Sequence, residues 1–216
     1  MNGSAPRTSV VRVRLSAPVR TRDGDVTGRV QLVILSQDRL EVTHLVIRME
    51  ALSSRDVTVP RELVLGVEDD GGTLHLKLAR PELETAPRFD PMAYLAPTEA
   101  RQRWARSGFL RRTYLSRPGD ASLASDAFAV GDDTMIFDRA EEPVGVITGI
   151  SFEALTGRVT GLACRLGSRV RTQLGGGAPV LIPATIIHRL VKSAAYPSGK
   201  GVTLSLQQAE IMRLTE

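Results

Sequence analysis

The strongest constraint on the fold is that one stretch of this sequence occurs twice. Gly28 recurs as Gly145, Thr43 as Thr160 and Arg48 as Arg165, an offset of 117 residues in every case. The match holds from residue 26 to residue 48 without a gap. A period so far above that of solenoid repeats, about 20–50 residues, indicates duplication of a whole small domain.

The repeat divides the 216 residues into three parts. We expect one domain over residues 8–80, a linker rich in proline and arginine over 81–127, and a second domain over 128–216. Each small domain leaves apolar surface that its duplicate can cover, so we expect the two to pack against each other.

Each copy has the sequence pattern of short strands joined by tight turns. Apolar and basic residues alternate over 11–15, Asp23 and Gly24 suit a tight hairpin turn, and Pro60 ends an apolar strand because it has no N–H to donate. Pro183 has the same place in the second copy, after a loop that is six residues longer. We therefore predict a mainly all-β fold, with two small antiparallel β-barrels joined by a partly helical linker.

Composition favours a soluble protein. Hydrophobic residues make up 42% of the chain, with no apolar run of the length that a membrane helix needs and no apolar stretch near Met1 that resembles a signal peptide, so we expect a cytoplasmic location. Cys164, the only cysteine, excludes an intramolecular disulfide and lies in an apolar strand pattern that predicts an inert core residue.

The net charge of +4 is concentrated in the linker, since basic and acidic residues nearly balance within each copy. A helix is expected to begin after Thr98 and to end near Gly108. Within and beyond it, aromatic residues interleave with arginines, and the candidate nucleic-acid or partner-binding residues are Arg101, Arg103, Trp104, Arg106, Arg111 and Arg112.

Two interpretations of this cluster remain open. Arginines beside aromatic rings clamp phosphates and stack on bases. Alternatively, the segment is a solvated interdomain helix anchored by Trp104. The arginine spacing spreads the cations around a helix, which favours the second interpretation.

The sequence predicts neither a catalytic site nor a cofactor or metal site. His44 and His75 could approach each other from neighbouring strands, but none of His44, His75 and His188 has a cysteine or carboxylate at metal-ligand spacing. The glycines at 175–177 lead into a strand through Ala178 and Pro179, unlike a phosphate-binding loop. We therefore expect a protein that is not an enzyme.

The turn glycines and the strands that end in proline resemble the PRC-barrel family, in tandem duplication. The residues that carry the resemblance are structural: Gly24, Gly28, Pro60, Gly145, Gly157 and Pro183. Residues 81–91 also resemble the tail that follows the barrel in stand-alone members, whereas in the second copy residues 207–211 replace that tail.

The resemblance implies a small β-barrel that docks against other macromolecules. We expect a non-enzymatic docking or adaptor module for a protein or ribonucleoprotein partner, without a cofactor. The alternative is an RNA- or ribosome-associated protein that binds phosphate directly through its arginine-rich linker.

Overall fold

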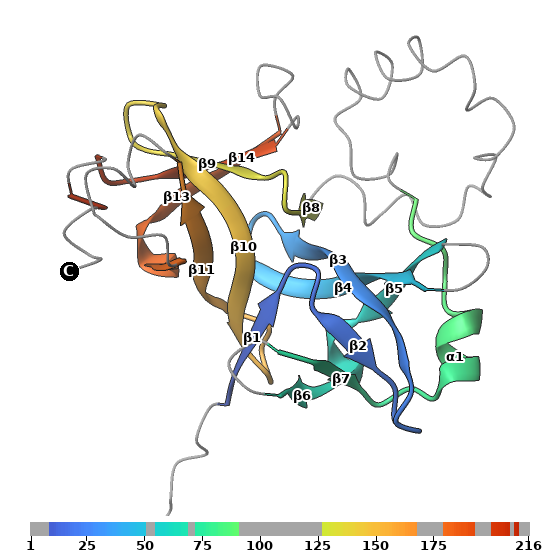
Figure 1. The fold of residues 1–216 in the computed structure, drawn as a ribbon. Helices are drawn as coiled ribbons and strands as arrows, with labels where there is room; N and C mark the ends of the chain where they lie inside the picture. The colour runs from blue at the N-terminus through green and yellow to red at the C-terminus, as the bar shows by residue number, and fades with distance from the viewer. Residues whose placement is uncertain are drawn as a thin grey trace, which may run out of the picture.

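The computed structural model describes residues 9–50, 55–68, 72–90, 127–167, 179–192, 200–207 and 210–211, and these fold mainly into two β-sheets (Figure 1). The first sheet has the strand order β5-β4-β3-β2-β7-β6. Its strands are β2 (Pro18–Arg20), β3 (Val26–Ser36), β4 (Glu41–Met49), β5 (Arg55–Pro60), β6 (Val64–Val67) and β7 (Leu74–Leu76). A 3₁₀ turn, η1 (Arg61–Leu63), joins β5 to β6, and a short helix, α1 (Arg80–Thr85), follows β7.

The second sheet repeats this topology in the order β12-β11-β10-β9-β14-β13. Its strands are β9 (Met135–Phe137), β10 (Pro143–Glu153), β11 (Val159–Leu166), β12 (Val180–Pro183), β13 (Ile187–Lys192) and β14 (Lys200–Leu204), with η3 (Ala184–Ile186) between β12 and β13. The duplication seen in the sequence is therefore a duplication of a complete six-strand order.

Each sheet gains a seventh strand from the other copy. β1 (Val10–Arg14) pairs with β10, and β8 (Ala127–Val130) pairs with β3 (Figure 1). The two pairings are equivalent under the 117-residue offset, since Val13 lies opposite Ile150 and Val130 lies opposite Val33. The first strand of each copy is thus exchanged reciprocally, as in a strand-swapped dimer fused into one chain.

A bulge in the long strands makes room for the exchanged strand. The register of β3 shifts between Val30 and Leu32, and that of β10 shifts at the equivalent place, between Ile147 and Gly149. A bulge bends its strand and increases the local twist. The first half of β3 pairs with β2 and the second half with β8, and β10 divides its pairing in the same way between β9 and β1.

The exchange gives the two copies a common hydrophobic core. Val11 and Val13 of β1 are buried beside Phe152, and Phe128 and Val130 of β8 are fully buried in the same continuous cluster. Complete burial of one such side chain stabilises a fold by about 1.5–3 kcal/mol. The apolar positions that alternate along β1 therefore contribute to the core of both copies.

The copies also meet directly along a short antiparallel seam. The amide of Val42 donates to the carbonyl of Gly157 at 2.7 Å, and the amide of Val159 donates to the carbonyl of Leu40 at 3.0 Å. Glu41 and Arg158, which are equivalent in the repeat, lie opposite each other between these bonds. The approximate two-fold relation of the copies passes through this pair.

The prediction of a mainly β fold is confirmed, and one detail of it, the purely antiparallel pairing, needs correction. Each sheet contains one parallel pair, β2 with β7 and β9 with β14, because the pairing strands are far apart in sequence and need no hairpin. Among the described residues no ladder joins β5 to β6 or β12 to β13, so the ladders leave both sheets open. The helix expected after Thr98 lies outside the described residues.

The repeat extends further than the sequence indicated, because the tail of the second copy is equivalent to that of the first. The Ala79 amide donates to the Glu82 carboxylate at 2.7 Å, and the Gln207 amide donates to the Glu210 carboxylate at 2.9 Å. Leu83 and its counterpart Ile211 are both buried in the core. Within the described parts of the chain, no helix is long and apolar enough to cross a membrane.

Substitutions of Gly28 and Gly145 test how closely the long strands β3 and β10 pack against their neighbours. A Cβ at either position would overlap a backbone carbonyl oxygen, that of Arg48 or Arg165. We expect Gly28→Ala and Gly145→Ala each to lower the free energy of unfolding by about 2 kcal/mol or more. Gly66→Ala is the control, since its Cβ meets nothing within 4 Å. Urea unfolding measures all three, and equal stability of the three variants would contradict the packing described.

Candidate functional site

The predicted arginine-rich site lies outside the described residues. This applies to Arg101, Arg103, Trp104, Arg106, Arg111 and Arg112, and also to the glycines at 175–177. The described parts of the chain offer two other features that bear on function: a clamp between the copies and a difference between their outer strands.

The predicted structural residues occupy the positions that their chemistry requires. Gly24 and Gly157 have φ angles of 91° and 77°, in the left-handed region that favours glycine. Pro60 and Pro183 each end an outer strand and lead into a 3₁₀ turn. These residues shape turns and strand ends rather than a binding site.

The three histidines are divided between the two sheets, with His44 and His75 in the first and His188 in the second. His44 is on β4 and His75 is on β7, and these strands are not neighbours because β3 and β2 separate them in the sheet. Burial lowers the pKa of His44, an effect that the nearby Glu62 carboxylate partly opposes. His75 approaches Glu68 at 3.5 Å. In the part of the chain that the structure describes, no three potential metal ligands gather.

Cys164 has the role expected from its position in the sequence. Its side chain is fully buried on β11, and burial raises the pKa of its thiol to about 12. The thiol is therefore protonated at neutral pH, which makes it a poor nucleophile.

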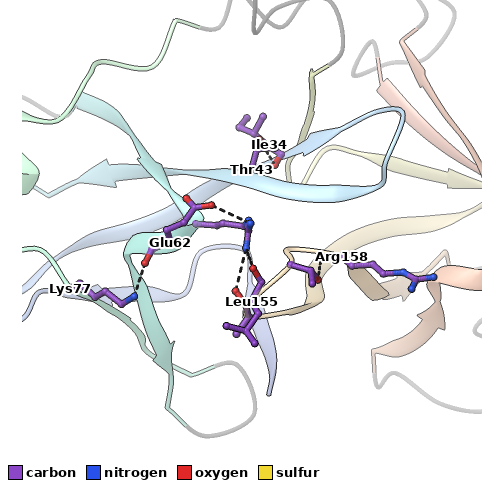
Figure 2. A network of polar contacts seen from close by, with 9 residues as sticks. Ile34, Thr43, Glu62, Lys77, Leu155 and Arg158 are labelled. Carbon is purple, nitrogen blue, oxygen red and sulfur yellow. Dashed lines mark hydrogen bonds and ion pairs between the residues drawn. The ribbon is translucent and has the colours of Figure 1, made fainter. Parts of the chain in front are cut away.

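Arg61 clamps the second copy to the first. Its Nη1 donates to the carbonyl oxygens of Ala154 and Leu155 at 3.3 and 2.8 Å, in the turn between β10 and β11 (Figure 2). Its Nη2 lies 3.2 Å from the Glu62 carboxylate. The repeat places Ala184 at the equivalent position, so this clamp exists on one side of the two-fold relation only.

The outer strand of the first sheet is covered by its own chain. The amide of Thr58 donates to the carbonyl of Pro87 at 2.8 Å, and the amide of Phe89 donates to the carbonyl of Asp56 at 2.9 Å. Residues 87–89 thus extend antiparallel along β5. A covered edge is protected from pairing with another chain.

The outer strand of the second sheet differs from β5 in this respect. β12 pairs with β11 on one side, and among the described residues no hydrogen bond reaches its other side. Leu181 stands in the place of Thr58 and is 51% exposed. An apolar side chain on an open strand is an available surface for pairing.

The charge beside the two outer strands differs as well. On β4, Arg48 donates twice to the Asp56 carboxylate, at 3.0 and 3.1 Å, which raises the pKa of the guanidinium. The counterpart of Arg48 is the exposed Arg165, and Pro179 replaces Asp56. Among the described residues no carboxylate pairs with Arg165.

Sequence reasoning did not find the open strand, although its signals are visible. Aligning the two copies at Pro60 and Pro183 puts Leu181 on Thr58 and Pro179 on Asp56. These differences gain meaning only when β5 and β12 are known to be edge strands, which depends on pairings with distant residues.

Comparison with known proteins adds no relative to this description. Neither the models of protein families nor the curated proteins contain a match to the chain.

The Arg61 clamp predicts an effect on stability. Arg61→Met removes the bonds to two carbonyl groups while keeping the apolar stem, and hydrogen bonds from a charged donor contribute about 1.5–3 kcal/mol. We expect a loss of that order in urea unfolding. Arg22→Met is the matched control because Arg22 is 66% exposed and its ion pair with Glu82 is 3.7 Å long. If both variants lose the same stability, the clamp does not hold the copies together.

His44 predicts a dependence of stability on pH. Because burial lowers its folded-state pKa below the ordinary value of 6.5, the unfolded chain binds a proton first as the pH falls below that value. Stability therefore decreases as the pH drops below about 6.5, whereas above that pH the imidazole is neutral in both states. His44→Gln should flatten this decrease in unfolding curves taken at several pH values. His188→Gln is the control because His188 is exposed. An identical pH profile of stability for His44→Gln and the parent protein would show that His44 does not cause the decrease.

Proposed function

We propose that this chain is a tandem PRC-barrel protein that acts, without catalysing a reaction, as a docking module. In this proposal each sheet curls into a small barrel. Side-chain packing closes the barrel where a 3₁₀ turn joins its two end strands, at η1 in the first copy and at η3 in the second. The features in favour are the repeated strand order, the glycines that admit close strands and the prolines that end the outer strands.

One observation carries the docking function: the first copy covers its outer strand with its own residues 87–89, whereas the described residues leave the equivalent strand of the second copy open. Duplication supplies this outer-strand surface twice, once at β5 and once at β12. Exposed Leu181 and Arg165 on the open copy make it suited to a partner, and strand edges are a common mode of protein recognition.

The test is capture of partners from native lysate by the tagged protein, with half of the sample treated with nuclease. We expect a defined protein partner that survives nuclease and that recovers this chain in the reciprocal capture. Loss of every association with nuclease would overturn the proposal and favour RNA binding by the linker.

A variant separates these two functions. Replacing Arg101, Arg103, Arg106, Arg111 and Arg112 by glutamine removes the cations on which RNA binding would depend, and affinity that falls steeply with salt is its signature. Docking by the barrels predicts that this variant keeps its protein partner.

A further inference from the structure

We propose that the side of β12 that the described residues leave unpaired binds an extended peptide segment of a partner by antiparallel strand addition, and that this segment has an apolar side chain and a carboxylate. This inference rests on the proposed docking function and assigns it a site. The first copy supplies the template, since residues 87–89 of the chain already bind β5 in this way.

The backbone of β12 presents the same hydrogen-bonding groups as β5. On β5, the Thr58 amide and the Asp56 carbonyl point away from the sheet toward the covering segment. Thr58 lies opposite Val46 in its ladder, and Leu181 lies opposite Ala163, the residue equivalent to Val46. The equal register directs the Leu181 amide and the Pro179 carbonyl outward, where a peptide strand would pair with them.

The side chains indicate an apolar residue in the bound segment. In the first copy, Phe89 packs against a buried cluster that includes Ile34 and Val46 on the outer face of the sheet. In the second copy, the Leu181 side chain packs over Gly161: its Cδ1 lies 3.1 Å from the point where a Cβ added to Gly161 would stand. Leu181 therefore forms an exposed apolar surface beside the open backbone, which an aromatic or aliphatic side chain would cover.

The charge indicates a carboxylate in the same segment. Asp56 satisfies Arg48 in the first copy, whereas Pro179 gives Arg165 no such partner. A carboxylate supplied by the peptide would give Arg165 the kind of arginine–carboxylate pair that Arg48 has in the first copy. The partner is thus an extended acidic segment with at least one large apolar residue.

Amide hydrogen exchange of the full-length protein tests whether the edge is open. We expect the Leu181 amide to exchange rapidly and the Thr58 amide, bonded to Pro87, to exchange slowly. Slow exchange at Leu181 in the free protein would mean that the chain covers this strand itself, and the proposal would then be wrong.

Binding is tested with a synthetic peptide that copies residues 84–90, Glu-Thr-Ala-Pro-Arg-Phe-Asp. Titration into the full-length protein, followed by amide chemical shifts, should perturb β12 and slow exchange at Leu181. We expect Leu181→Pro, which removes the outward amide, to weaken binding by about tenfold or more. Leu181→Thr keeps the outward amide and removes the exposed apolar side chain, so it should weaken binding less than Leu181→Pro while keeping the fold.

Charge variants test the role of Arg165. Arg165→Glu should weaken binding several-fold, whereas Arg189→Glu makes the same charge change at an exposed position on β13 and should have no effect. Shifts that map elsewhere, no saturable shift up to about 1 mM peptide, or equal affinity of all variants would each refute the β12 site. A captured protein partner that remains bound to Leu181→Pro would leave docking intact and remove only this site.

Discussion

The reciprocal pairing of β1 with β10 and of β8 with β3 is the interaction on which the rest of the structure depends. Without β8, the second half of β3 would present unpaired amide and carbonyl groups next to the core, which is costly for buried backbone. The exchanged strands also supply Val13 and Phe128 to the hydrophobic cluster that both copies share. Neither copy is therefore a complete folding unit, even though each has its own strand order.

The approximate two-fold relation also explains where function can arise. Some positions are alike in both copies, as at Gly28 and Gly145, because each admits the same close approach of the next strand of its own sheet, β4 or β11. Positions outside this constraint have diverged. Arg61 clamps one side of the seam where Ala184 stands on the other, and Leu181 lies on a strand whose outer side no described residue pairs with, whereas Thr58 is covered.

The sequence predicts the local features well and the long-range ones poorly. Turns and strand ends followed from Gly24 and Pro60 and from their repetition, because these features depend on neighbouring residues. The exchange of β1 did not follow, since an alternating strand is equally compatible with either sheet and only the three-dimensional pairing distinguishes them. The difference in edge pairing between β5 and β12, seen in the described residues, was missed for the same reason. The candidate arginines of the linker lie outside the described residues, so their role remains a prediction from sequence.

The most direct test of the strand exchange is to cut the chain between the copies. A specific protease site inserted within residues 91–126 leaves β1 on one fragment and β10 on the other. After cleavage under native conditions, we predict that the two fragments elute together in size-exclusion chromatography and unfold in a single transition, because each completes the other's sheet and the core is shared. Separation into two folded fragments, each with its own unfolding transition, would contradict the exchange and the account of the fold built on it.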